Sequence, residues 1–194
     1  MKRSFDILFS FFAISILSPL FLVICIAIKL TSKGPCIFRQ ERIGLNLSHF
    51  TILKFRTMIL GAQNLGDGLY SYHDDFRVTP IGHILRKSSL DELPQLFNIL
   101  FGHMSLIGPR PPVVDELGDV SDFPPYLVRR FNVKPGLTGL AQISGRNALN
   151  WSRKIAYDLL YIRLYKSCPL YIDCFILFKT IFIVLTFKNV VETK

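Results

Sequence analysis

Residues 79–102 read TPIGHILRKSSLDELPQLFNILFG. Its pattern predicts a turn, a short helix and then a second helix that carries Asp91 and Glu92 side by side. One explanation for this pair is a capping box, with Ser89 as the N-cap and Glu92 three residues later. Pro94 fits poorly with that cap, because it would then be the fifth helical residue, where its missing N–H removes a hydrogen bond. A cap nearer Asp91 would suit the proline and would put both carboxylates at the positive end of the helix.

Basic residues recur around this pair in the pieces of sequence predicted to be non-helical or helix ends. A cluster of this kind is either a set of salt bridges or a phosphate site that contains a metal ligand. Glycines at 136, 139 and 145 predict backbone that phosphate oxygens can approach closely, where main-chain N–H groups bind them well. The basic candidates for binding substrate phosphates are Lys54, Arg56, Arg86, Arg110 and Arg146.

Composition indicates a membrane-associated protein with an anionic partner. Half of the 194 residues are hydrophobic, 17 are Phe, and the formal net charge is +9. A basic chain binds nucleic acid, acidic lipid head groups or a phosphorylated substrate. No nucleic-acid-binding signature is present, and the hydrophobic composition favours the other two partners. The four cysteines form no CxxC pair and are expected to be reduced thiols.

The N-terminal segment predicts a membrane helix. Residues 7–28 are interrupted only by three serines and Pro19, and a helix of that length covers about 33 Å, enough to cross a bilayer. A spanning helix is therefore one interpretation. Ser18 and Pro19 fall at its middle, where proline bends a helix and serine helps to satisfy the freed carbonyl. Both flanks are basic, so the positive-inside rule finds little asymmetry. We therefore predict a re-entrant helix over residues 1–30 that returns to the same face.

The remaining residues, 31–194, predict one catalytic domain on that face. Residues 36–41 and 50–55 are β-prone and read as a small β-hairpin. Residues 60–75 predict a long loop, and GPRPP at 108–112 must be an ordered turn. Two further helices are expected at 151–166 and 171–187, either buried or lying as amphipathic helices at the membrane interface. The fold class predicted is therefore α+β and predominantly helical.

Three long motifs then carry a family resemblance. KFRTM at 54–58, RVTPIGHILRKSSLDELPQLFNILFGHMSLIGPRP at 77–111 and KPGLTGLAQISGRN at 134–147 resemble the bacterial sugar transferase family, the monotopic phosphoglycosyl transferases. The resemblance runs from the N-terminal segment to about residue 187. It implies an enzyme at the cytoplasmic face of the bacterial inner membrane that moves a sugar-1-phosphate from a UDP-sugar to polyprenyl (undecaprenyl) phosphate, the first membrane step of glycan assembly.

The resemblance also implies roles for individual residues. Asp91 matches the catalytic nucleophile, Glu92 a Mg²⁺ ligand, and Arg110 a phosphate-binding arginine, while Ser18 and Pro19 match the helix-breaking pair. Attack by Asp91 would release UMP and leave an aspartyl-phosphosugar intermediate. Asp91 must be ionised for this, and we expect the helix end and nearby cations to favour its charge. Two alternatives stay open: a non-catalytic protein that binds anionic lipids at the membrane surface, and a one-step glycosyl transferase that releases UDP. An oligomer is compatible with either.

Overall fold

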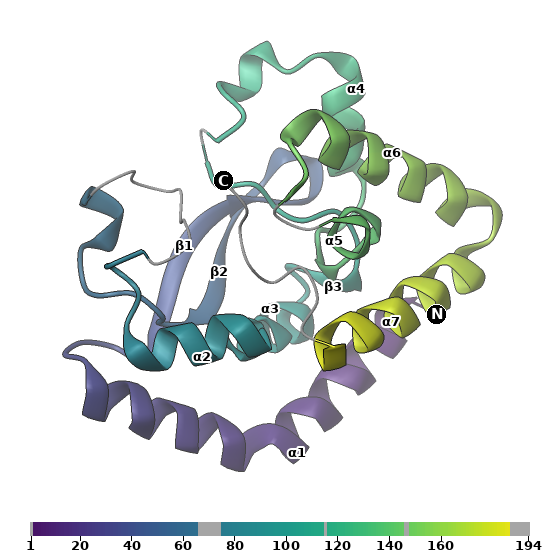
Figure 1. The fold of residues 1–194 in the computed structure, drawn as a ribbon. Coiled ribbons are helices and arrows are strands. Elements are labelled where there is room, and N and C mark those ends of the chain that lie inside the picture. The colour runs from purple at the N-terminus through teal and green to yellow at the C-terminus, as the bar shows by residue number, and fades with distance from the viewer. Residues whose placement is uncertain (1, 66–74, 115, 146–147, 187–194) are drawn as a thin grey trace.

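The computed structural model describes residues 2–65, 75–114, 116–145 and 148–186 (Figure 1). Arg146 and most of the predicted loop at 60–75 lie outside these ranges. The described chain is predominantly helical with two small strand pairs, which confirms the predicted α+β class. Its helices are α1 Lys2–Thr31, α2 Pro80–Ser88, α3 Gln95–Phe101, α4 Pro125–Val128, α5 Leu140–Ser144, α6 Trp151–Ser167 and α7 Pro169–Thr186, and its strands are β1 Ile37–Ile43, β2 His49–Phe55, β3 Ser105–Ile107 and β4 Gly136–Thr138.

The N-terminal helix α1 continues through its proline. Pro19 lies inside the helix and has no N–H to donate to the carbonyl of Ser15. The Ser18 hydroxyl donates to that carbonyl instead, at 2.9 Å. Figure 1 shows the axis of α1 changing direction along its length. The Ser-Pro pair therefore bends α1 without ending it.

Helix α1 lies along the rest of the protein instead of projecting from it. Asp6 and Ser10 are buried near its start, and Ile24 and Ile28 near its end. Between them, Ala13, Ile14 and Leu17 pack on the main core, and Leu20 and Phe21 on a second cluster formed with Phe55 and Leu85. Since contacts recur from the first turn to the last, both ends of α1 are held by the same folded unit.

Polar contacts fix each end of α1. At the start, Lys2 forms an ion pair with Asp173 of α7, and Arg3 donates to the carbonyl of Leu100 at 2.8 Å, at the C-terminal end of α3, where a cation suits the helix dipole. At the other end, Arg56 donates to the carbonyls of Ser32 and Lys33.

The predicted β-hairpin is confirmed and is slightly longer than expected. Strands β1 and β2 are antiparallel, with Ile37 opposite Phe55 and Ile43 opposite His49. Alternate residues of β2 turn Phe50 and Ile52 into the core, as the period of a half-buried strand requires.

A second strand pair was not predicted. Strands β3 and β4 are parallel, with Ser105 opposite Gly136, and at three residues each they are too short to give a sequence pattern. Glycines let them approach closely: a Cβ on Gly136 would lie 2.0 Å from the backbone nitrogen of Gly108, and one on Gly139 would lie 2.1 Å from its carbonyl oxygen. Our expectation that Gly136 and Gly139 leave backbone open to phosphate is therefore wrong, because another stretch of chain occupies that space.

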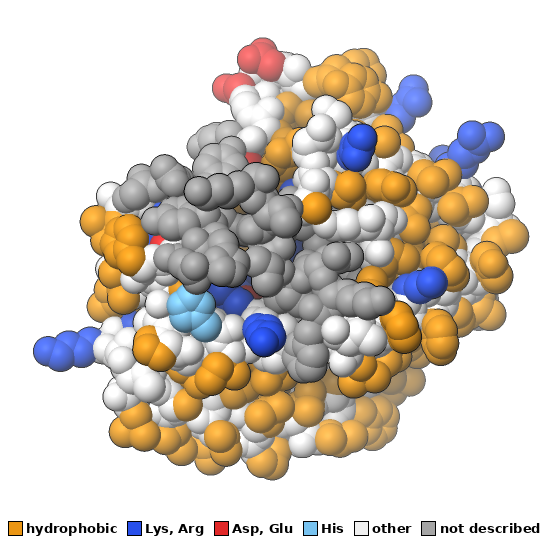
Figure 2. All heavy atoms as spheres, viewed as in Figure 1, with side chains coloured by type: hydrophobic (Ala, Val, Ile, Leu, Met, Phe, Trp, Pro, Cys, Tyr) orange, Lys and Arg blue, Asp and Glu red, His pale blue; other side chains and the backbone are white. Residues whose placement is uncertain are grey.

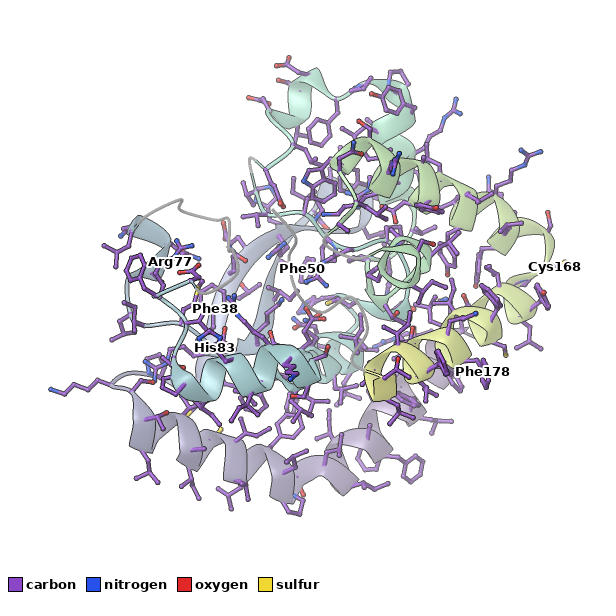
Figure 3. All side chains as sticks on the ribbon, in the orientation of Figure 1. Phe38, Phe50, Arg77, His83, Cys168 and Phe178 are labelled. Carbon is purple, nitrogen blue, oxygen red and sulfur yellow. The ribbon has the colours of Figure 1, made fainter. Side chains whose placement is uncertain are left out.

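The apolar surface lies over α1 and α7. Helix α7 buries Ile172 and Ile176 but exposes most of its other large apolar side chains, so it is a surface helix and not a core helix. Figure 2 shows hydrophobic side chains along the lower edge, over α1, and on the side formed by α7. In the described part of the chain, α1 and α7 are both long and apolar enough to cross a membrane. The exposed apolar residues of α7 are Leu170, Tyr171, Phe175, Phe178 (labelled in Figure 3), Ile181, Phe182 and Leu185.

Candidate active site

Asp91 and Glu92 lie in a tight turn between two helices. Helix α2 ends at Ser88, and its C-cap Ser89 adopts a left-handed conformation with φ 58°. The 3-10 turn Leu90–Glu92 follows directly. Helix α3 begins only at Gln95, after Pro94. The Ser89 side chain does not cap the turn, so the capping-box explanation is wrong. Because the proline precedes the helix, its missing N–H costs no helical hydrogen bond.

Glu92 is held by two cations from distant parts of the chain. Its Oε1 accepts from Lys54 Nζ of β2 at 2.9 Å and from Arg110 Nη2 at 2.8 Å. Its Oε2 has a single long contact, 3.5 Å from Arg110 Nη1. All three side chains are partly exposed, so the ion pairs face an accessible site.

The two neighbouring carboxyls differ in their electrostatics. Burial alone would raise the pKa of Glu92, but the charges of Arg110 and Lys54, and their hydrogen bonds, hold it well below its usual range. Burial raises the pKa of Asp91 to about 6, with a further upward contribution from the Glu92 charge, against the lowering effect of Lys54 and two arginines. We expected cations to favour the Asp91 charge. The cations act in that direction, because Lys54, Arg86 and Arg110 each lower the pKa of Asp91, but burial outweighs them. A pKa near 6 still leaves Asp91 mostly ionised at neutral pH, as expected.

Asp91 has no direct partner in the part of the chain that the structure describes. Among the described residues, its half-buried carboxylate forms no hydrogen bond and no ion pair. A carboxylate with unengaged oxygens beside a locked, ionised neighbour is suited to act as a nucleophile, since its lone pairs are available for attack.

The turn that carries Arg110 is fixed at four successive carbonyls. Prolines at 109, 111 and 112 donate no N–H, so this turn is held through its acceptors. The carbonyls of Pro109, Arg110, Pro111 and Pro112 accept, in that order, from Gly136 N at 2.9 Å, Arg130 Nη2 at 2.8 Å, Arg42 Nη1 at 2.9 Å and Ile43 N at 3.1 Å. The predicted ordered turn is confirmed, and it aims the Arg110 guanidinium at Glu92.

Two arginines that the sequence did not single out support this turn. Arg130 is buried with Asp158, which it meets at 2.8 Å. Arg42 lies close enough to the site for its charge to act on Arg110 and Glu92. Its pKa falls to about 10, first through burial and then through the Arg110 charge, so it stays cationic at neutral pH. One sequence feature could have pointed to Arg42 as a site residue: it lies at the end of a predicted strand, next to a loop.

The other predicted phosphate binders are placed differently. Arg86 donates to the Thr57 hydroxyl at 3.0 Å, and its charge lowers the pKa of Asp91, so it belongs to the site. Arg56 is buried, and its two terminal nitrogens go to carbonyls after α1, which makes it a brace for that connection. Arg146 lies outside the described residues.

The donor set fits a magnesium ion shared with substrate. Mg²⁺ is usually held by one or two carboxylates together with substrate phosphates and water. Asp91 is unengaged, and Oε2 of Glu92 is the less occupied oxygen of that carboxylate. Within the described ranges, no group of three or more His, Cys, Asp or Glu side chains is placed to hold a metal. Asp91 and Glu92 would therefore supply only part of a coordination shell for such an ion.

The fold and site describe a protein with two long apolar helices and a carboxylate pair set among basic side chains. Comparison with known families shows which one: residues 1–187 match the bacterial sugar transferase family, and the chain belongs to that family.

Curated relatives agree with this assignment. The chain is 42% identical over 186 residues to a UDP-glucose:undecaprenyl-phosphate glucose-1-phosphate transferase of Klebsiella pneumoniae, covering 93% of this chain but 39% of that protein. It is 41% identical to the exopolysaccharide production protein ExoY of Sinorhizobium fredii, covering 93% of this chain and 83% of that one. An undecaprenyl-phosphate galactose phosphotransferase of Salmonella typhimurium is 40% identical, with 95% and 40% covered. The chain thus spans about two fifths of the length of the first and third relatives.

Proposed function

We propose that this protein transfers a sugar-1-phosphate from a UDP-sugar to polyprenyl (undecaprenyl) phosphate, giving a polyprenyl-diphospho-sugar and UMP. The observation that carries the proposal is the unpartnered Asp91 carboxylate beside Glu92, which Lys54 and Arg110 hold ionised. Relatives named for glucose-1-phosphate transfer and galactose phosphotransfer to undecaprenyl phosphate support the same reaction class. Because those names differ in their sugar, the proposal is made for UDP-sugars as a class.

In the first half-reaction, an Asp91 oxygen attacks the sugar-bearing phosphorus. The bond from that phosphorus to the bridging oxygen breaks, and its electron pair leaves with UMP. The product on the enzyme is an aspartyl phosphosugar. Lys54, Arg86, Arg110 and Arg42 supply positive charge around the diphosphate, and the fork of Arg110 suits two phosphate oxygens at once.

In the second half-reaction, an oxygen of polyprenyl phosphate attacks the same phosphorus and releases the Asp91 carboxylate. Neither step needs a proton from the protein, since nucleophile and leaving group are both anionic oxygens. Catalysis therefore rests on positioning and charge neutralisation. A magnesium ion, held by Glu92 and the substrate phosphates, would supply further neutralisation of that negative charge.

We also propose that α1 is re-entrant and that the catalytic domain sits at the cytoplasmic face of the bacterial inner membrane. Both ends of α1 are tied to one folded unit, through Lys2 with Asp173 and through the carbonyls that Arg56 binds. A helix crossing the bilayer would have to carry one of these ends to the opposite side, away from its partners. The exposed apolar faces of α1 and α7 would then lie in the same leaflet.

The test is a single turnover without acceptor. The protein with UDP-sugar and Mg²⁺, but no polyprenyl phosphate, is expected to release up to about one UMP per active site and to keep the phosphosugar covalently. Mass spectrometry of digested protein should place the adduct on the peptide that contains Asp91. Asp91→Asn should abolish UMP release and product, because an amide does not form the acyl phosphate. Glu92→Gln should slow both half-reactions and weaken the response to Mg²⁺.

Other outcomes would replace the proposal. Release of UDP instead of UMP would identify a one-step glycosyl transferase. Turnover with acceptor but no adduct without it would make Asp91 a metal ligand in a direct transfer. Full activity in both variants, or no turnover with any UDP-sugar, would favour a non-catalytic protein that binds anionic lipids.

A further inference from the structure

A cavity separate from the carboxylate site opens at the start of α1. Its volume is about 310 Å³, roughly ten times the ~30 Å³ that one water occupies in the liquid. None of the residues that contact Glu92 lines it. Among the lining residues are Lys2, Arg3, Ser105, Lys134 and Tyr165.

The charges in this cavity favour an anion. Three of the ionisable side chains that line it are cationic, namely Lys2, Arg3 and Lys134, against the one carboxylate of Asp6. Lys2 is paired with Asp173, whereas the described partners of Arg3 are neutral carbonyls, so the balance of charge stays positive. Asp6 is already engaged, since its Oδ1 accepts from the Leu106 N–H at 3.0 Å. The lining phenol Tyr161 stays neutral, because burial raises its pKa, and its hydroxyl already donates to Asp173 Oδ1 at 2.9 Å.

Two donors in the cavity have no partner among the residues that the structure describes. The Ser105 hydroxyl is buried, at 2% exposure, and within the described residues it has no hydrogen bond. The half-buried Lys134 ammonium likewise has no ion pair or hydrogen bond with any described residue. A buried polar group without a partner costs free energy, so an acceptor at this position would stabilise the protein.

The cavity lies at the polar border of the apolar surface. Lys2 is tied to α7 through Asp173, and Figure 1 shows the N-terminus beside α7. Phe5 and Leu8 of α1 and Leu170 of α7 are exposed around this end. Basic residues and tyrosines next to exposed apolar helices are typical of the head-group level of a membrane.

We infer that this cavity binds the phosphate of an anionic glycerophospholipid, with Ser105 and Lys134 as direct donors and Arg3 and Lys2 supplying further positive charge. The lipid would hold the start of α1 at head-group depth while its chains follow the exposed apolar side chains of α1 and α7. This site is distinct from the proposed substrate site and does not depend on the proposed activity.

The test is lipid binding to the purified full chain in detergent, measured by native mass spectrometry with dioleoylphosphatidylglycerol. One tightly retained lipid is expected. Lys134→Gln and Ser105→Ala should each weaken its binding by about tenfold, which corresponds to about 1.4 kcal/mol, and Lys134→Arg should retain it. The matched control is Lys166→Gln, the same change at an exposed position of α6 outside the cavity. Unchanged melting temperatures would show that the variants fold, and UMP release should stay at the wild-type rate.

Competition identifies the ligand. Inorganic phosphate and soluble glycerophosphoglycerol should displace the lipid only weakly if the membrane-anchored head group is the true ligand. Displacement by inorganic phosphate at the affinity of the lipid would overturn the lipid assignment. Wild-type affinity in both cavity variants, or an equal loss in Lys166→Gln, would overturn the site itself and leave only general attraction to a basic surface.

Discussion

Replacing Asp91 with Asn should remove activity and at the same time stabilise the protein. Folding raises the pKa of Asp91 from 3.8 to about 6, and each pKa unit corresponds to about 1.4 kcal/mol. The buried charge therefore costs up to about 3 kcal/mol at neutral pH, which partial exposure to solvent reduces to roughly 1–2 kcal/mol. For a chain of this size, the neutral Asn variant should melt roughly 2–8 °C higher.

The pH dependence of this gain is fixed by the sign of the pKa change. Below the unfolded value of 3.8 the carboxyl is protonated in both states, so Asn gains nothing. Between 3.8 and about 6 the unfolded state ionises first, and the wild type loses stability relative to the variant. The full difference is present above about pH 6. Thermal melts in detergent at pH 4 and pH 7.5, monitored by circular dichroism, measure it.

Glu92→Gln is the matched control, because the neighbouring carboxyl has the opposite shift. The pKa of Glu92 is lowered by Arg110 and Lys54, so Gln leaves both cations without their partner and should lower the melting temperature at pH 7.5. That loss should shrink as the pH falls through the lowered pKa. If Asp91→Asn destabilises at pH 7.5, or raises the melting temperature equally at pH 4, the electrostatic reasoning about the pair is wrong.

Three further predictions concern the frame of the site and the membrane helix. Arg110→Lys should lose most UMP release while keeping the melting temperature within a few degrees, because an ammonium lacks the two-pronged contact; wild-type rates would show that this arginine only braces its turn. Asp158→Asn should lower the free energy of unfolding by roughly 3 kcal/mol or more, and the melting temperature with it, because it leaves the buried Arg130 charge without its carboxylate. A melting temperature close to wild type would show that solvent reaches Arg130. A cysteine at position 2 should be labelled only from the cytoplasmic side of spheroplasts, and labelling from the periplasm would refute the re-entrant arrangement. Pro19→Ala should straighten α1 and shift the protein toward a spanning topology.

Much of the architecture follows from the sequence, because it depends on local periodicity and backbone chemistry. Two β-prone segments predicted the hairpin that β1 and β2 form, and the apolar run predicted α1. The Ser18 hydroxyl replaces the hydrogen bond that Pro19 lacks, as local chemistry suggested. The Asp91–Glu92 pair was recognisable from its motifs, whereas its proposed role still requires the turnover experiment.

Long-range packing decided what the motifs alone did not. Strands β3 and β4 have only three residues each, too few to give a sequence pattern. Their parallel pairing, with the close approach of Gly136 and Gly139 to Gly108, is found only in the structure. Glu92 is locked because Lys54 from β2 and Arg110 from a distant turn meet on one oxygen, and Arg42 enters the site through the same turn. The pKa of Asp91 rises because burial, which no linear spacing encodes, outweighs the charges of its neighbours. The sequence therefore shows which groups are available, and long-range packing places two cations on Glu92 while Asp91 forms no ion pair with any described residue.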